Sequence, residues 1–311
     1  MSQIASPFIS VVSPVYGAAD LVDLLVVNIS KVLRTLTPSF EIILVDDGSL
    51  DGAWIKIEQN VQRVPQVKGI KLSRNFGQHR AIMAGLKLST GQWVVVMDCD
   101  LQDNPLEIPH MLQKALEGYK IVLAQRNNKK HPLLKIFLSQ IFNRVLSFLT
   151  NLPFDSRIGN FGLYHREVIS AICQESERVQ YFPMMVQKVN FRRTVLENEH
   201  KERPIGNSSY SVGKNLKLAA SVLFSNFSKP LQKTIPISIL IAFLAGLLVY
   251  CFSSQPGNNY PEGGFNFSQI VVPTGLFFFL CTIRFYLTKI LKKKQNQTSY
   301  VIEKKVNFDN H

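Results

Sequence analysis

The stretch WVVVMDCD, from Trp93 to Asp100, reads as a buried strand that ends in two acidic residues. An uninterrupted β-branched run of this kind is typical of a parallel sheet that is covered on both faces. Ligands of such sheets bind beyond the carboxyl ends of the strands. If the strand reaches Asp98 and Asp100, both carboxylates point the same way, because residues two apart share a face. The stretch therefore predicts an α/β sheet with a ligand site at this strand end.

Strand-like and helical patterns alternate on both sides of this stretch. The sequence predicts strands over residues 8–13, 40–45, 67–72, 93–97 and 120–124, with helices over 21–36, 51–64, 79–88 and 106–117 between them. This alternation predicts a mainly parallel, Rossmann-like sheet with helices on both faces.

Acidic residues follow two of the predicted strands. Asp46 and Asp47 end the second strand, as Asp98 and Asp100 end the fourth. Paired carboxylates suit a hard divalent ion that bridges phosphates. The glycine patterns of dinucleotide sites and P-loops are absent from the sequence, so a metal ion on Asp100 is the expected neutraliser of a diphosphate. Asp51 and Asp103 are better explained as helix N-caps.

Composition narrows the class of protein. The 311 residues carry 35 Lys and Arg against 22 Asp and Glu, a formal charge of +13, and 46% are hydrophobic. Such a chain is not disordered, and it attracts polyanions. The four cysteines form no CxxC pair, which argues against a zinc site or a disulfide framework. No zinc-finger spacing or RNP-like aromatic pattern supports nucleic-acid binding.

Two apolar runs near the C-terminus predict a transmembrane hairpin. Residues 234–252 contain no charge, and a second run from residue 269 to 290 contains Arg284. About 20 apolar residues span a bilayer, and the lysines on both flanks place these flanks in the cytoplasm. A buried hairpin of a soluble domain is the alternative. Arg284 would be better tolerated at a helix interface, which suggests a homo-oligomer.

The rest of the chain divides around this hairpin. Residues 1–212 are expected to form the catalytic domain, 213–233 an amphipathic juxtamembrane segment, and 291–311 a basic cytoplasmic tail. The N-terminus lacks the features of a signal peptide. Amphipathic stretches at 135–149 and 214–227 either lie on the bilayer surface or pack in the core. We expect a multi-pass protein of the bacterial inner membrane with its catalytic domain in the cytoplasm.

Four motifs resemble those of one family. SPVYG (13–17), VDDGSLDG (45–52), LSRNFGQHRAIMAGL (72–86) and VVVMDCDLQDNP (94–105) are similar to GT-A-fold family 2 glycosyltransferases that load a sugar onto a polyprenyl phosphate. Bacterial bactoprenol glucosyltransferases and dolichyl-phosphate mannose synthases are members. The resemblance covers about residues 7 to 230, and the two apolar runs match the bacterial branch. It implies a GT-A catalytic domain followed by two transmembrane helices.

The resemblance also implies roles for individual residues. On the donor side, Pro14 and Tyr16 would line the nucleobase pocket, Asp46 would bind the base, Arg74 and Asn75 would line the donor pocket, Asp98 would lie near the ribose, Asp100 with Asp98 would hold Mg²⁺ or Mn²⁺, and Gln102 would lie by the diphosphate or sugar. On the acceptor side, Arg126 would grip the acceptor phosphate as a catalytic residue beside Asp100, assisted by Lys135, with Arg203, Ser209 and Tyr210 near the phosphates. Asn160 receives no role.

Together with these residues, the resemblance implies an inverting, metal-dependent hexosyltransferase. The expected donor is a UDP-sugar and the acceptor undecaprenyl phosphate, giving a lipid-linked sugar for cell-envelope glycans such as lipopolysaccharide. A lipid phosphate is already anionic, so it needs no strong general base. A processive synthase is disfavoured, because its QxxRW element needs a tryptophan after the DxD motif and the chain has only Trp54 and Trp93. Two further hypotheses are a transferase that acts on a sugar hydroxyl and a noncatalytic membrane scaffold.

Overall fold

The computed structural model describes residues 8–126, 158–175, 182–198 and 300–308. The strands are β1 (Ile9–Val15), β2 (Phe40–Asp46), β3 (Val67–Leu72), β4 (Trp93–Val96), β5 (Ile121–Arg126), β6 (Ile158–His165), β7 (Arg193–Asn198) and β8 (Ile302–Val306). The helices are α1 (Ala19–Leu36), α2 (Ala53–Arg63), α3 (Gln78–Leu88), the 3₁₀ turn η1 (Pro105–Glu107), α4 (Ile108–Leu116), α6 (Arg166–Glu175) and α7 (Phe182–Lys188).

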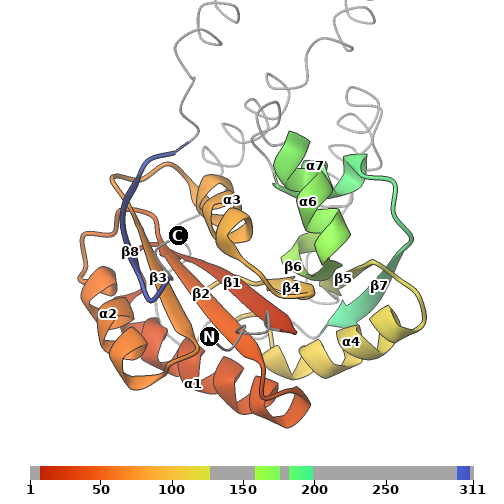
Figure 1. Cartoon of the computed structure of the whole chain (residues 1–311), viewed down its shortest axis with the longest axis horizontal. Helices are drawn as coiled ribbons and strands as arrows, with labels where there is room; N and C mark the ends of the chain where they lie inside the picture. Colours follow the sequence, from red (N-terminus) through yellow and green to blue (C-terminus); the bar gives the residue numbers. More distant parts are fainter. Residues whose placement is uncertain (1–7, 127–157, 176–181, 199–299, 309–311) are drawn as a thin grey trace, which may run out of the picture. The chain divides into compact units, whose positions relative to one another are not determined.

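These strands form one mixed sheet in the order β7-β5-β6-β4-β1-β2-β3-β8 (Figure 1). Its central strands β4, β1, β2 and β3 are parallel, as the alternating pattern predicts. Two antiparallel pairings place β6 between β4 and β5, so β5 runs parallel to β4. The carboxyl ends of β1 to β5 therefore lie at one edge of the sheet.

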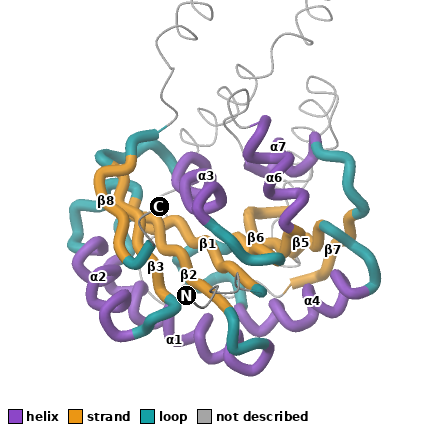
Figure 2. Tube along the Cα trace, in the orientation of Figure 1, coloured by secondary structure: helices purple, strands orange, loops and turns teal. Residues whose placement is uncertain are grey.

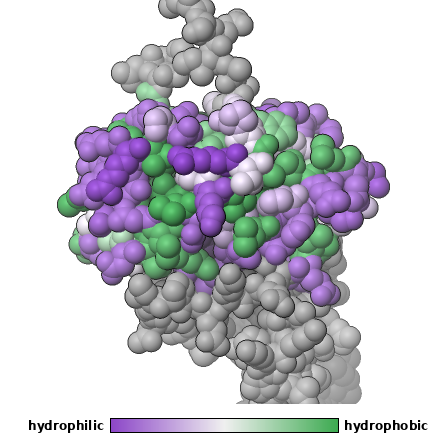
Figure 3. Space-filling view, turned by 90° about the horizontal axis from the view of Figure 1, so that it is seen from below, coloured by the Kyte–Doolittle hydropathy of each residue, from purple (hydrophilic) through white to green (hydrophobic). Residues whose placement is uncertain are grey.

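Helices cover both faces of the sheet, as expected for an α/β domain (Figure 2). Residues of α3, α6 and α7 pack with Val12, Ile43 and Val45 in one apolar cluster, whereas α1, α2 and α4 pack with the alternate strand residues in a second. The two clusters follow from the two-residue period of strands. Figure 3 shows mainly hydrophilic residues with scattered apolar ones on the described part of the lower face, which is typical of the outer side of amphipathic helices.

Most predicted boundaries agree with the structure to within a few residues, and the differences have local causes. Pro14 lies inside β1 instead of ending it, because β4 pairs with β1 only as far as Val12. The turn before α4 is capped by Asn104, whose Oδ1 accepts from Leu106 N at 3.3 Å, and not by Asp103. The N-cap of α2 is Gly52 and not Asp51 as predicted, although the Asp51 carboxylate, one residue earlier, accepts from Ala53 N at the start of α2 and from Ala19 N at the start of α1.

Three strands were not expected, because the sequence analysis predicted no strand at β6, β7 or β8. Residues 302–306 lie in the range predicted to be a basic tail, yet they form β8, which pairs antiparallel with β3 at the sheet edge. The predicted spans at 234–252 and 269–290 and the amphipathic stretches lie outside the described residues. Among the helices that the structure describes, none is both long and apolar enough to cross a membrane.

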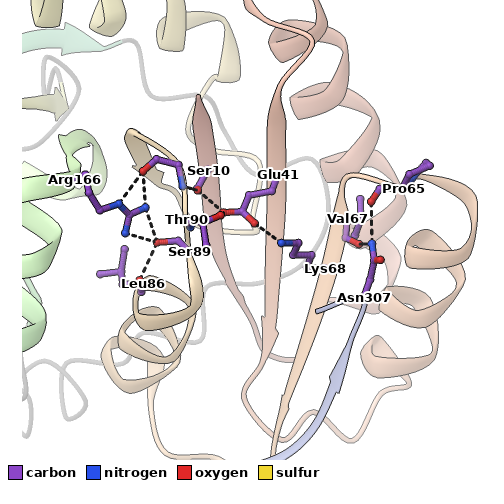
Figure 4. Close-up of polar contacts among 11 residues, drawn as sticks. Ser10, Glu41, Pro65, Val67, Lys68, Leu86, Ser89, Thr90, Arg166 and Asn307 are labelled. Carbon is purple, nitrogen blue, oxygen red and sulfur yellow. Dashed lines mark hydrogen bonds and ion pairs between the residues drawn. The ribbon is translucent and has the colours of Figure 1, made fainter. Parts of the chain in front are cut away.

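The opposite, amino end of the sheet holds a buried polar network (Figure 4). Glu41 on β2 accepts from Ser10 Oγ at 2.6 Å and from Thr90 N at 2.7 Å, and it forms an ion pair with Lys68 at 2.7 Å. Arg166, at the start of α6, donates to the Gly91 carbonyl. This network ties β1, β2 and β3 to the turn before β4. It therefore stabilises the end of the sheet opposite the carboxyl ends of the parallel strands.

Candidate active site

The predicted donor-side residues gather at the carboxyl edge of the sheet. Each lies at the carboxyl end of a strand or in the loop after it: Pro14 and Tyr16 at β1, Asp46 at β2, Arg74 and Asn75 after β3, and Asp98, Asp100 and Gln102 after β4. Pro14 is buried, whereas Tyr16 is 55% exposed. Strands from four separate parts of the sequence thus place this set at one edge, which is where α/β sheets bind ligands.

Asp46 is a buried carboxylate with one unpaired oxygen. Its Oδ1 accepts from Ser49 N at 3.0 Å, which closes the turn after β2. Its Oδ2 is buried and accepts no hydrogen bond from any residue in the described part of the chain. Burial raises the pKa of Asp46 above its usual value, against the effect of the Ser49 contacts. A buried acceptor without a donor is costly, so this oxygen is suited to a ligand N–H.

Asp47, beside it, is fully engaged by backbone groups. Its Oδ1 accepts from Phe76 N at 2.7 Å and its Oδ2 from Gly77 N at 2.9 Å. Burial raises the pKa of this carboxyl as well. Asp47 therefore anchors the segment that follows β3, a positioning role that the sequence analysis did not assign. The sequence signal for this role was the pair Asp46-Asp47 directly after a strand, because two adjacent buried carboxylates need two separate sets of hydrogen-bond donors.

Gly48 lets the two loops approach closely. Its φ of +72° is in the left-handed region, and a Cβ placed there would lie 2.5 Å from Arg74 C and 2.6 Å from Asn75 N. Only a residue without a side chain permits this contact. Arg74 and Asn75 are exposed, and the Arg74 guanidinium lies 4.8 Å from the centre of the Phe76 ring. Their backbone is thus fixed while their side chains point outward.

Asp98 is held by two side-chain amides. Its Oδ1 accepts from Gln78 Nε2 at 2.6 Å and from Asn160 Nδ2 at 3.2 Å. Gln78 begins α3 and Asn160 is a buried residue of β6. Both are positioning residues for Asp98. Neither was predicted, because their contacts join positions 20 and 62 residues away from Asp98 in the sequence.

β4 does not reach Asp98 and Asp100, so the prediction that both carboxylates share one face of a strand is wrong. β4 ends at Val96, and Asp100 lies in a turn in which its Oδ1 accepts from Gln102 N at 3.2 Å. Leu101, between them, has a φ of +59°. Such backbone in a residue with a side chain is strained and is often found at functional sites. Cys99 packs against the apolar core, and burial raises the pKa of its thiol to about 12.

The carboxylates of Asp98 and Asp100 suit a metal ion whose remaining ligands come from the substrate. No group of three or more His, Cys, Asp and Glu side chains forms a metal cage among the described residues. A hard divalent ion that bridges phosphates takes only one or two carboxylates from the protein. Asp98 and Asp100 have this chemistry.

The acceptor-side residues are described only in part. Arg126 ends β5, so its backbone lies at the same edge as the end of β4, and it pairs with Asn198 of β7. The structure does not describe its side chain. Lys135, Arg203, Ser209 and Tyr210 lie outside the described residues.

The mainly parallel sheet, with polar residues at its carboxyl edge, is that of the α/β proteins whose ligands bind beyond the carboxyl ends of the strands. Residues 10–173 match the model of glycosyl transferase family 2. The chain therefore belongs to glycosyltransferase family 2, which confirms the predicted resemblance, and it is a glycosyltransferase.

Similar proteins include two named undecaprenyl-phosphate 4-deoxy-4-formamido-L-arabinose transferases. The protein from Photorhabdus laumondii is 32% identical over 77% of this chain and 74% of its own length. The protein from Proteus mirabilis is 33% identical over 78% of this chain and 74% of its own length. The glucosyl-3-phosphoglycerate synthase structure from Mycobacterium tuberculosis aligns with 72% of this chain and 80% of its own, at 17% identity and a TM-score of 0.49.

Proposed function

We propose that this glycosyltransferase moves a sugar from a nucleotide-sugar, a UDP-sugar in the first instance, to a polyprenyl phosphate at the cytoplasmic face of the bacterial inner membrane. The proposal rests on two features of the carboxyl edge of the sheet. Asp46 Oδ2 is buried and accepts no hydrogen bond from the described residues, and Asp98 is held in place by hydrogen bonds from Gln78 and Asn160. The names of the similar transferases from Photorhabdus laumondii and Proteus mirabilis support undecaprenyl phosphate as the acceptor.

On the donor side, the proposal gives each residue a task. Asp46 accepts an N–H of the base in the pocket beside Pro14 and Tyr16, and Arg74, Asn75 and Gln102 contact the phosphates and sugar. Mg²⁺ or Mn²⁺ held by Asp100, with Asp98, would neutralise the diphosphate and so stabilise the leaving group. Asp98 is held by amides, which donate hydrogen bonds to its charged form.

The acceptor needs positioning more than activation. A phosphate oxygen of the lipid attacks the anomeric carbon, the bond from that carbon to the diphosphate oxygen breaks, and the nucleoside diphosphate leaves with inversion. Because the attacking oxygen is already anionic, a cationic group that holds it replaces a general base. We assign this task to Arg126 at the end of β5, with Lys135, Arg203, Ser209 and Tyr210 as further candidates.

The test is transfer by membranes that contain the full chain. Membranes are incubated with Mn²⁺, undecaprenyl phosphate and a panel of radiolabelled nucleotide sugars, and the label in the lipid fraction is measured. Asp100→Asn keeps the Oδ1 that accepts from Gln102 N but removes the charge, so it should fold and lose transfer by about 100-fold or more.

Asp23→Asn is the matched control. Asp23 lies on α1, where it forms a partly exposed ion pair with Lys56 of α2, so this variant should leave transfer unchanged. Absence of label in the lipid for every donor would refute the acceptor. Transfer by Asp100→Asn at more than half the normal rate would refute the metal role.

A further inference from the structure

We propose that the C-terminal strand β8 positions the donor loop, defined as residues 73–76, and thereby sets the affinity for the nucleotide. The inference rests on the proposed function, because that function assigns donor contacts to Arg74 and Asn75. It adds a role for a segment that lies more than 220 residues farther along the chain.

The pairing between β8 and β3 continues into the donor loop. Leu72, the last residue of β3, pairs with Ile302, and Ser73 N then donates to the Val301 carbonyl at 3.0 Å. One residue earlier, Lys71 forms an ion pair with Glu303 at 2.7 Å. β8 therefore holds the residue directly before Arg74.

The other end of the donor loop is held by the turn after β2. Asp47 accepts from Phe76 N and Gly77 N, and the backbone of Gly48 lies against the Arg74–Asn75 peptide. Arg74 and Asn75 thus lie between two fixed points, the turn after β2 and the strand β8. Ordering such a loop costs conformational entropy, and a loop that is ordered before the ligand arrives spares the ligand that cost.

β8 itself is anchored at both ends. At the end near the donor loop, Tyr300 and Ile302 pack on the core cluster that contains α3. At the far end, Asn307 Nδ2 donates to the carbonyls of Pro65 and Val67, each at 2.8 Å. Phe308, beside Asn307, packs on the same core cluster, but the contacts of Ile302 and of the Asn307 side chain are separate, so each of these two can be removed without the other.

The experiment compares a variant at each end in the full-length protein. Ile302→Ala weakens the near end and Asn307→Ala the far end. Affinity for UDP with Mn²⁺ is measured by calorimetry, hydrogen exchange at Phe76 and Gly77 by mass spectrometry, and the melting temperature is recorded for both. We expect Ile302→Ala to weaken UDP binding by about 3- to 10-fold and to speed exchange at both amides, with Asn307→Ala within twofold of the unchanged protein at a comparable loss of melting temperature.

A chain that ends at Thr298 gives a second measurement. If it folds, its UDP affinity should fall at least as far as that of Ile302→Ala, and a synthetic peptide of residues 299–311 should restore it. If it does not fold, the two point variants decide.

Equal effects of Ile302→Ala and Asn307→Ala on binding and exchange, or a folded truncated chain with unchanged affinity, would overturn the inference. If the full-length protein transfers no sugar to lipid but Ile302→Ala still weakens UDP binding and speeds exchange, the proposed acceptor fails and the role of β8 stands.

Discussion

At the scale of single residues, Asp46 and Asp47 show that equal burial does not mean equal function. Both are at most 2% exposed, and burial raises the pKa of both. Their partners differ, because Asp47 accepts from two backbone amides while Asp46 Oδ2 accepts from none in the described residues. Asp47 therefore serves the fold, whereas the open acceptor of Asp46 supports our proposal that it binds the nucleotide.

This difference predicts opposite effects for the same substitution. A carboxyl whose folded pKa is raised contributes stability below its unfolded pKa of about 3.8 and loses it as the pH rises through the folded pKa, so the charged form of Asp46 is a net cost to stability. Asp46→Asn removes that charge and keeps the acceptor for Ser49 N. It should raise the melting temperature of the ligand-free protein while it weakens UDP binding by about 10- to 100-fold.

Asp47→Asn is the matched control. It places an amide NH₂ against a backbone N–H and should cost about 2–3 kcal/mol of stability. Thermal unfolding and UDP calorimetry on both variants test the pair. The assignment of Asp46 to the ligand would be wrong if Asp46→Asn destabilised the protein as much as Asp47→Asn and bound UDP normally.

At the scale of elements, the turn between β2 and α2 offers a second matched pair. Gly48 and Gly52 both have positive φ, at +72° and +84°, but only Gly48 faces backbone within 3 Å, whereas nothing lies within 4 Å of a Cβ at Gly52. Gly52→Ala should therefore cost only the backbone strain, about 1 kcal/mol. Gly48→Ala must also push the donor loop away.

We expect Gly48→Ala to cost at least about 2 kcal/mol more than Gly52→Ala and to weaken UDP binding, because Arg74 and Asn75 would shift. Unfolding in denaturant gives the first quantity and calorimetry the second. Equal costs for the two variants would show that the contact between Gly48 and the donor loop is not a tight one.

The network at the amino end of the sheet should matter for stability and not for binding. Burial acts to raise the pKa of Glu41, but the hydrogen bonds from Lys68, Ser10 and Thr90 outweigh it and hold the pKa below its usual value. Its contribution is therefore present above a pH of about 4.5 and is lost as the pH falls through the lower, folded pKa.

Glu41→Ala should cost about 3–5 kcal/mol at pH 7, because it leaves the partly buried Lys68 without its partner, and the cost should shrink at low pH. Unfolding curves at a series of pH values measure this change. Glu117→Ala, which breaks an exposed pair with Lys114, should cost under about 1 kcal/mol. A loss of UDP affinity in folded Glu41→Ala would contradict the separation of the two sheet ends.

The elements that the sequence predicted well are those with a strong local pattern. Val67–Leu72 is a strand with the predicted bounds, since its β-branched and apolar residues are flanked by breaks in the pattern. β8 was missed because Ile302–Val306 contains three charged residues and gains its structure only by pairing with a distant edge. The strand ends predicted which residues gather at the carboxyl edge of the sheet, but Gln78 and Asn160 depend on tertiary contacts that no local pattern encodes.

At the scale of the whole molecule, β8 constrains how the chain can cross a membrane. β8 and β3 belong to one sheet, so residues 302–306 must lie on the same side of any bilayer as the domain formed before residue 199. The segment between them must then cross an even number of times. The two apolar runs at 234–252 and 269–290 predict two crossings, with the link between them on the opposite side.

Cysteine labelling in whole cells tests this topology. Asn258→Cys lies in the link and Asn310→Cys near the C-terminus, and the chain without an added cysteine gives the background from its four native thiols. A maleimide that does not cross membranes should label position 258 once the outer envelope is opened, and position 310 only after the inner membrane is permeabilised. Labelling of both positions, or of position 310 alone, before permeabilisation would show that the two runs do not form a hairpin. A single crossing would place β8 and β3 on opposite sides of the membrane, so β8 would have to separate from the sheet. A chain with that topology should therefore have a lower melting temperature than one in which the β3–β8 pair is intact.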